Sequence, residues 1–248
     1  AGQVSNTPPG NDFVQVAGAT YSSFALKADG SIVSWGDDLY GLVSNTPTGN
    51  DFVEVVGTVS ERHTHALKTD GSIVSWGDDW YGSISNTPPG NDFVQVRAGS
   101  THSLALKTDG SIVSWGNDNV GQVSNTPPGN DFVQVAAGSS FSVAVKTDGS
   151  LIAWGWDMQG QVSNPPPGND FVQVVAGHLS ASALRVDGSV VSWGASSDSP
   201  IGNDFVKLAA GKYHFFAMRP PRPPEGEISS WGSDLDGQVS NTPTGADF

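Results

Sequence analysis

Short apolar runs recur along the chain with a spacing of about 40 residues, and most of them are joined in pairs by an Asp-Gly turn. The clearest copy is Lys107-Thr-Asp-Gly-Ser-Ile-Val-Ser-Trp-Gly116. Close copies end at Trp35, Trp76, Trp154, Trp193 and Trp231, so successive tryptophans are 41, 39, 39, 39 and 38 residues apart. A fixed period in this range is typical of propellers, solenoids and other repeat arrays.

One repeat, starting at residue 132, illustrates the elements that the pattern predicts. Strand A is expected at residues 132–138, strand B at 142–146, strand C at 151–154 and strand D at 160–163. The Asp-Gly pair at 148–149 lies between two apolar runs, which is typical of a β-hairpin with a type I′ turn. Both phases of strand C are largely apolar, as expected for a strand that neighbouring blades cover on both faces.

Four short strands in each unit, with no helical stretch, favour a propeller blade over a helical solenoid. The sequence therefore predicts an all-β protein, a six-bladed β-propeller of four-stranded antiparallel blades. Residues 1–248 would form a single domain of six repeats of about 39 residues. Strand A ends in Ala and Gly, which suits the crowded centre of a propeller, so we expect strand A innermost and strand D outermost.

The tryptophan that ends each strand C has two interpretations. A row of exposed tryptophans would form aromatic platforms for a ligand, whereas buried ones would be wedges between blades. Truncating a buried tryptophan typically costs about 3–5 kcal/mol, a large share of a domain's stability. Six copies at one position of the repeat favour the packing role.

Composition narrows the class of partner. The chain has 25 acidic and 11 basic residues, a net charge of −14, and no cysteine. An acidic surface disfavours nucleic acids and anionic membranes, and it favours partners with basic or mixed-charge surfaces. Without cysteine, disulfides and thiolate metal sites are excluded. No apolar run approaches 18 residues, so no transmembrane segment is expected. The compartment stays open, with a secreted or extracellular location favoured.

Three departures from the repeat are visible. The A–B loop between residues 56 and 65 is longer than its counterparts, and residues 219–226 replace the Asp-Gly hairpin with a proline-rich loop. The segment at residues 2–13 is nearly repeated at 237–248. Such a duplicate arises when a domain is cut from a longer array, and it could also supply a spare strand that pairs with another molecule.

The pattern Ala98-Gly-Ser-Thr-His-Ser-Leu-Ala-Leu-Lys-Thr-Asp-Gly-Ser-Ile-Val-Ser-Trp-Gly116, followed by Gly121 and Gln122, resembles the repeat of the regulator of chromosome condensation family. This resemblance covers essentially the whole chain. It implies a propeller, usually seven-bladed, in which strands from the two ends close the ring. The short repeat is also similar to that of bacterial propeller-type β-lactamase inhibitory proteins. Those bind their enzyme through aromatic and acidic residues on the loops of one face.

The A–B and C–D loops of an up-and-down blade emerge on one face, and in this chain they are the parts in which the repeats differ. Variable loops on a rigid scaffold are the usual place for binding, and aromatic residues are enriched in binding hot spots. We therefore expect a non-enzymatic protein that binds a protein partner through this face. The candidate binding residues are Tyr21, Asp38, Tyr40, Asp79, Trp80, Tyr81, Phe141, Trp156, Asp157 and Tyr213.

Two other functions stay open. Aromatic residues flanked by carboxylates also suit sugar rings, so a carbohydrate-binding module is one alternative. A structural repeat domain that self-associates through its spare terminal strand is the other. The five histidines lie in different repeats or at alternating positions, and the sequence has no nucleophile elbow and no metal-ligand spacing. We expect no catalytic residues, no cofactor and no metal.

Overall fold

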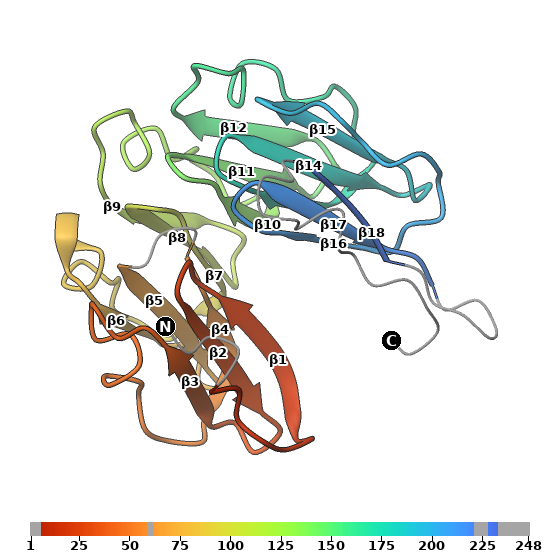
Figure 1. The fold of residues 1–248 in the computed structure, drawn as a ribbon. Coiled ribbons are helices and arrows are strands. Elements are labelled where there is room, and N and C mark those ends of the chain that lie inside the picture. The colour runs from red at the N-terminus through yellow and green to blue at the C-terminus, as the bar shows by residue number, and fades with distance from the viewer. Residues whose placement is uncertain (1–5, 59–61, 221–227, 233–248) are drawn as a thin grey trace. The chain divides into compact units, whose positions relative to one another are not determined.

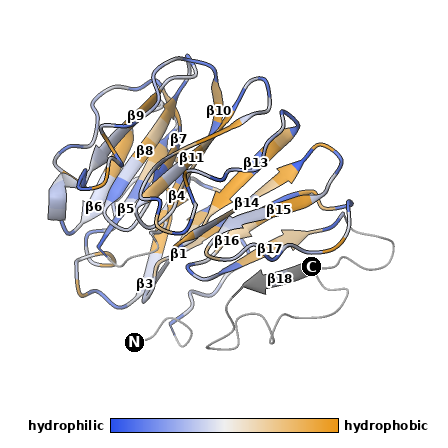
Figure 2. Cartoon of the chain, turned by 90° about the horizontal axis from the view of Figure 1, so that it is seen from above, coloured by the Kyte–Doolittle hydropathy of each residue, from blue (hydrophilic) through white to orange (hydrophobic). Residues whose placement is uncertain are grey.

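The computed structural model describes residues 6–58, 62–220 and 228–232, and the chain divides into two compact units at residues 130 and 131. Within the described residues the fold is all-β, with six antiparallel sheets of three strands each and one short 3-10 turn, η1 (Trp80–Gly82) (Figure 1). Apolar positions lie mainly in the strands, and polar positions lie mainly in the connecting loops (Figure 2).

Each unit contains three sheets, and each sheet consists of three consecutive strands. The sheets of the first unit are β1 (Phe13–Gly18), β2 (Ser22–Lys27) and β3 (Ile32–Gly36); β4 (Phe52–Val56), β5 (His63–Lys68) and β6 (Ile73–Gly77); and β7 (Phe93–Ala98), β8 (His102–Lys107) and β9 (Ile112–Gly116). Those of the second unit are β10 (Phe132–Ala137), β11 (Phe141–Lys146) and β12 (Leu151–Gly155); β13 (Phe171–Ala176), β14 (Ser180–Arg185) and β15 (Val190–Gly194); and β16 (Lys207–Ala210), β17 (His214–Met218) and β18 (Ile228–Gly232). Strands A, B and C are therefore confirmed in all six repeats.

The prediction of a fourth strand is wrong for the repeats that the structure describes in full. The expected strand D at residues 160–163 is a series of turns, in which the N–H of Asn164 donates to the carbonyl of Gly160. Asp157 explains the difference, because its Oδ1 accepts the N–H groups of Val162 and Ser163 at 2.7 and 2.9 Å. Backbone donors that a β-ladder would need are thereby bound to a side chain. The expected strand D of the sixth repeat lies outside the described residues.

The B–C hairpin also differs in detail from the type I′ turn expected at Asp148 and Gly149. Only the glycine has a positive φ, 79°, and its N–H donates to the carbonyl of Lys146 at 2.9 Å. This is a type I turn followed by a glycine bulge, a common three-residue hairpin loop. The Oδ1 atom of Asp148 accepts both the N–H and the hydroxyl of Ser150, so the aspartate holds the turn closed.

The tryptophans of the second to fifth repeats are buried, as the packing interpretation predicts, and Trp35 is half-buried. Trp76 and Trp115 are 5% and 4% exposed, and their Nε1 atoms donate to the carbonyls of Leu42 and Ser83 in the preceding repeat, each at 2.9 Å. In the second unit, Trp193 donates to Gln161 in the same way at 3.0 Å. Each of these side chains therefore fills the space between two sheets and also satisfies a loop carbonyl. The side chain of Trp231 lies outside the described part of the chain.

A glutamine on strand A joins neighbouring repeats. The amide of Gln15 donates to the carbonyl of Val55 and accepts its N–H, and Gln134 does the same to Val174. Glu54 stands at this position in the second repeat, where a carboxylate cannot donate. Arg97 supplies the missing donor, because its Nη1 atom donates both to Glu54 and to the carbonyl of Val96, at 2.6 Å each.

The repeated basic residue near the end of strand B has a structural role in every repeat. Lys107 pairs with Asp92 at 3.1 Å and lies over the ring of Phe93, and the five counterparts make the same two contacts. These ion pairs are partly exposed, so each contributes at most about 1 kcal/mol.

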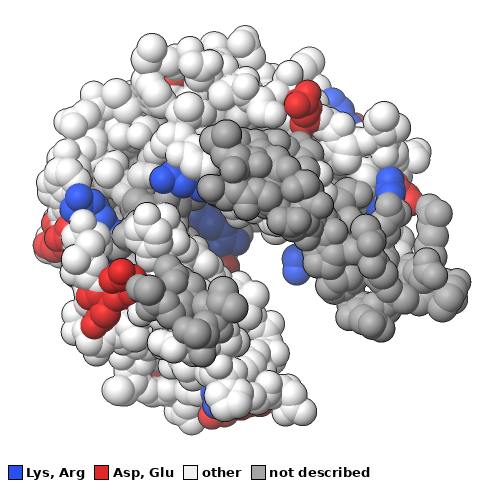
Figure 3. All heavy atoms as spheres, viewed as in Figure 1, with Lys and Arg blue, Asp and Glu red and all other residues white. Residues whose placement is uncertain are grey.

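On the face in Figure 3, Lys and Arg lie in separate small groups rather than in one continuous basic patch.

Candidate functional site

In the first unit the A–B and C–D loops meet at one end of each sheet, as predicted. The backbone N–H that opens the C–D loop donates to a carbonyl of the A–B loop in all three repeats. These bonds run from Asp37 to Tyr21, from Asp78 to Arg62 and from Asn117 to Thr101, at 2.8, 2.5 and 2.9 Å. The two variable loops of a repeat therefore form one surface, which we call the loop end.

A stack of four side chains dominates the loop end of the first unit. The guanidinium of Arg62 lies over the ring of Tyr40 at 5.0 Å and over the ring of Trp80 at 3.9 Å. Trp80 is stacked on Tyr81, with ring centroids 4.8 Å apart and an interplanar angle of 17°. The Nη1 atom of Arg62 also donates to Oδ2 of Asp78 at 2.8 Å. We call Tyr40, Arg62, Trp80 and Tyr81 the aromatic stack.

Tyr81 reaches this position through an unusual backbone conformation. Its φ is 61° and its ψ is 19°, and it is the one non-glycine residue with positive φ in the described part of the chain. The left-handed conformation costs a residue with a Cβ about 1–2 kcal/mol. Tyr40, at the same position of the first repeat, has an ordinary φ and is half-buried against the Phe24 and Leu42 cluster. Tyr81 is 41% exposed and Trp80 is 47% exposed.

The aspartates that were expected to steer a partner have a structural role first. Oδ1 of Asp79 accepts the N–H groups of Ile84 and Ser85 at 2.8 Å each, and Asp38 and Asp157 make the equivalent pairs of bonds. The N–H groups of Ser85 and Ile84 stabilise the ionised carboxylate and hold the pKa of Asp79 below its usual value. These carboxylates are exposed, so they stay charged at neutral pH while they shape the loops.

The structure brings three of the predicted residues together: Tyr40, Trp80 and Tyr81. Tyr21 is at the loop end of the first repeat and is 49% exposed. The other aromatic candidates belong to the second unit. Trp156 is half-buried, and Tyr213 is 47% exposed with its ring edge-on to His178 at 5.3 Å.

Phe141 is a wrong prediction, because its side chain is 0% exposed. It is the first residue of β11, so strand B begins one residue earlier than expected, and the ring packs in the core with Val143 and Trp193. An aromatic ring at that position fills the space left by Gly138, where an added Cβ would lie 2.1 Å from the ring. Phe141 therefore cannot be an anchor on the surface.

Sequence reasoning also missed residues at the loop end. Arg62, which lies in the long A–B loop and was not among the candidate binding residues, contacts both Tyr40 and Trp80 in the aromatic stack. Leu39, Val120 and Met158 are 70%, 40% and 74% exposed, and they occupy the C–D loop positions that Trp80 and Tyr81 occupy in the second repeat. A signal was available, because at least one of the two residues after the C–D loop aspartate is apolar or aromatic in four successive repeats.

His63 and His65 belong to a buried hydrogen-bond chain between two repeats of the first unit. Oγ of Ser103 lies 2.7 Å from Nε2 of His65 and 3.1 Å from Nε2 of His63, and Nδ1 of His65 lies 2.7 Å from Oγ of Ser75. Burial lowers the pKa of His63 to about 4, although Asp78 acts in the opposite direction. Both imidazoles are at most 1% exposed, which gives them a packing role. Among the described residues, no group of three or more His, Cys, Asp or Glu could hold a metal ion.

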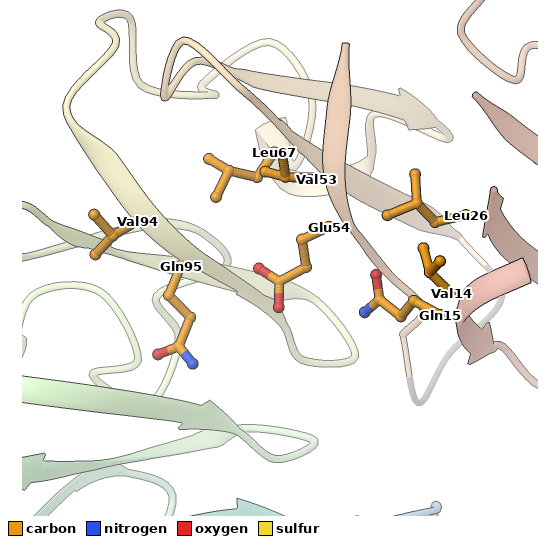
Figure 4. A pocket seen from close by; sticks show the side chains of 8 residues that line it. All are labelled: Val14, Gln15, Leu26, Val53, Glu54, Leu67, Val94 and Gln95. Carbon is orange, nitrogen blue, oxygen red and sulfur yellow. The ribbon is translucent and has the colours of Figure 1, made fainter. Parts of the chain in front are cut away.

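A hollow of about 330 Å³ in the first unit lies near the other end of the strands (Figure 4). Its walls include the exposed side chains of Val14, Val53 and Val94, with Gln15 and Glu54 among its polar residues. Both polar side chains are already bound to neighbouring repeats through the contacts described above.

Comparisons with known proteins identify the repeat. The model of the regulator of chromosome condensation (RCC1) repeat matches residues 93–122 and 132–161. No curated protein sequence gives a significant match. No helix in the described residues is long and apolar enough to cross a membrane. The similarity to bacterial propeller-type β-lactamase inhibitory proteins is not tested by these findings and stays a hypothesis.

Solved structures are similar in fold at low sequence identity. The ectodomain of the receptor kinase CR4 from Physcomitrella patens is 22% identical, with a TM-score of 0.76; the match covers 93% of this chain and 64% of that one. Prp20p from Saccharomyces cerevisiae is 18% identical, with a TM-score of 0.73 and coverage of 94% and 74%. The yeast RCC1 (Prp20) structure with bound Kap60 matches at 17% identity and a TM-score of 0.70, covering 90% and 70%. Residues 93–122 and 132–161 therefore match the RCC1 repeat, and the fold of the chain is similar to that of RCC1-like propellers.

Proposed function

We propose that this protein is a non-enzymatic scaffold that binds a protein partner through its A–B and C–D loops. The observation that carries the proposal is the aromatic stack at the loop end of the first unit. Trp80 and Tyr81 are large side chains that keep 47% and 41% of their surface exposed. Tryptophan and tyrosine are the residues most enriched in binding hot spots, together with arginine.

The aromatic stack is pre-organised for binding. The guanidinium of Arg62 lies over the ring of Trp80 and is held by its hydrogen bond to Asp78. The two backbone hydrogen bonds to Asp79 fix the conformation of the loop that carries both rings. A rigid surface loses little conformational entropy when a partner binds, which raises affinity for a given contact area. The strained backbone of Tyr81 supports the same interpretation, because strain of this kind is concentrated at functional sites.

The relatives support the general class of function. One similar structure is that of Prp20p, reported with its binding to Gsp1p and histones, and another is that of yeast RCC1 bound to Kap60. Gsp1p, the histones and Kap60 are all protein partners of a propeller with this fold. At 17–18% identity they support protein binding as a class and carry no partner over to this chain.

The principal alternative is a carbohydrate-binding module, since a stacked Trp–Tyr pair also suits a sugar ring. Sugar sites need hydrogen-bonding side chains beside the aromatic face. The carboxylates of Asp78 and Asp79, in the loop that carries the two rings, are already bound to Arg62 and to backbone N–H groups. This favours the protein partner. We also propose that residues 1–248 form one propeller of six blades. Self-association through residues 237–248, which lie outside the described part of the chain, remains the third hypothesis.

Affinity capture with matched baits tests the proposal. The baits are the natural protein, a Trp80→Ala/Tyr81→Ala variant, and a Val94→Ala control. Val94 is 50% exposed at the far end of β7, away from the loop end. We expect at least one protein from the source organism to be retained by the natural protein and the control and lost by the double variant. Identical capture by all three baits would refute the loop-end surface. Binding of one glycan class on an array would favour the carbohydrate alternative.

A further inference from the structure

The aromatic stack has an order that indicates what its open end can accept. Tyr40, the Arg62 guanidinium, Trp80 and Tyr81 follow one another, with separations of 5.0, 3.9 and 4.8 Å. Trp80 contacts both Arg62 and Tyr81, whereas Tyr81 contacts Trp80 alone among the rings and cations of the described residues, so Tyr81 ends the series. In the described part of the chain, no further ring or cation stacks on its second face.

The stack already contains a guanidinium between two aromatic rings. A planar cation is attracted to the negative face of an aromatic ring and stacks flat against it, and arginine is the residue most often found in this role. The geometry between Tyr40 and Trp80 shows that this surface orders such a group at 3.9–5.0 Å. The exposed face of Tyr81 offers a partner the same chemistry.

Charge around the stack also favours a cation. The C–D loops of the first unit carry Asp37, Asp38, Asp78, Asp79 and Asp118, and residues 37–46, 78–87 and 117–126 contain no lysine or arginine. Arg62, the cation of the stack, is paired with Asp78 at 2.8 Å. The net charge of the chain is −14. An approaching cation therefore meets an attractive field, and an approaching carboxylate or phosphate is repelled.

We propose that the exposed face of Tyr81 receives the guanidinium of an arginine side chain from the protein partner, as a fifth layer of the stack. This assignment rests on the proposed function and adds the chemistry of the residue recognised. Tyr81 is then the specificity-determining residue of the surface, and Trp80 and Arg62 position its ring.

Short peptides test the assignment without the partner. The probes are Gly-Gly-Arg-Gly-Gly and the same peptide with citrulline or lysine in place of arginine. Citrulline keeps the planar shape without the charge, and lysine keeps the charge without the plane. Binding is followed by NMR through the ring signals of ¹³C-labelled tyrosine, at fixed ionic strength. We expect saturable shifts of the Tyr81 signals, with arginine bound about 5- to 30-fold more tightly than citrulline and more tightly than lysine.

Two variants make the outcome specific. Tyr81→Ala should abolish the arginine preference, and Val94→Ala, at the far end of β7 from the loop end, should leave it unchanged. Equal shifts with all three peptides, or shifts confined to Tyr21, would overturn the assignment. If the peptides show no preference while capture still depends on Trp80 and Tyr81, only the arginine assignment fails. If capture is independent of both residues, the proposed function fails, whatever the peptides do.

Discussion

The pairing of Glu54 with Arg97 provides a test of how neighbouring repeats are held together. Two other junctions have a glutamine at the position of Glu54 and a valine at the position of Arg97: Gln15 with Val56, and Gln134 with Val175. Replacing Arg97 with valine should therefore destabilise the first unit, because Glu54 loses its ion-pair partner and the carbonyl of Val96 loses its donor. Adding Glu54→Gln should restore much of the stability, because glutamine both donates and accepts.

The magnitude follows from the bonds involved. Arg97→Val removes one hydrogen bond to a carboxylate and one to a carbonyl, both 2.6 Å long. Such bonds contribute about 1.5–3 and about 1 kcal/mol when buried. The side chains of Arg97 and Glu54 are 28% and 19% exposed, so solvent offsets part of the loss. We expect a net loss of about 2 kcal/mol from Arg97→Val and a recovery of about 1–2 kcal/mol in the double variant.

Urea denaturation followed by circular dichroism and tryptophan fluorescence measures these changes, and the four proteins of the cycle give the coupling energy. A coupling of at least about 1 kcal/mol, with unchanged urea dependence, is the expected result. If Arg97→Val costs nothing, or if Glu54→Gln adds to the loss, the glutamine bridge does not hold the repeats together and the reasoning is refuted.

Three other predictions concern packing, turns and pH. Trp115→Phe should lower the unfolding free energy by about 1–3 kcal/mol, because it removes the hydrogen bond to Ser83 and leaves a cavity. Trp80→Phe should change the unfolding free energy by less than about 0.5 kcal/mol, and urea denaturation of both variants measures the difference. Gly149→Ala should lower the melting temperature by several degrees, because φ is 79° and the new Cβ would lie 2.3 Å from the carbonyl oxygen of Asn169, whereas Gly18→Ala, with nothing within 4 Å, should be nearly neutral. Unfolding free energy should fall as pH decreases from 6.5 towards 4, because His63 takes up its proton near pH 6.5 when unfolded and only near pH 4 when folded. Each buried imidazole then contributes about 1.4 kcal/mol per pH unit to the slope of unfolding free energy against pH. His65→Leu, which introduces the residue found at Leu104 of the next repeat, should reduce this slope. An unchanged slope would contradict a buried neutral imidazole at His65.

Much of the fold could be predicted from the sequence because the repeat reports the same local preference six times. The same apolar positions recur in all six repeats, so strands A, B and C and the packing of the tryptophans could be predicted even where one copy is irregular. The missing strand D could not be predicted in this way. Residues 160–163 have a strand-like composition. They form turns because the carboxylate of Asp157 accepts the backbone N–H groups five and six residues further on.

The loop end was predictable as a surface but not residue by residue. Trp80, Tyr81 and Tyr40 were identified because large aromatic residues stood out in variable loops. Phe141 was misplaced because one residue at a strand boundary separates a loop tip from the core. The partnership of Arg62 with Tyr40 and Trp80 joins two repeats and three loops, and such a contact has no signal in a periodic pattern. The left-handed backbone of Tyr81 is invisible for the same reason, since Tyr40 stands at the same position with an ordinary φ.

The most direct test of the proposed function is calorimetric titration of the captured partner, once purified, into the natural protein and its variants. Trp80→Ala should weaken binding by about 30-fold or more, as expected for a hot-spot tryptophan, while the Val94→Ala control changes affinity by less than about threefold. Both variants should melt within about 2 °C of the natural protein, because the two side chains are half-exposed. Unchanged affinity of Trp80→Ala, in a protein that melts normally, would contradict a partner surface built on the aromatic stack.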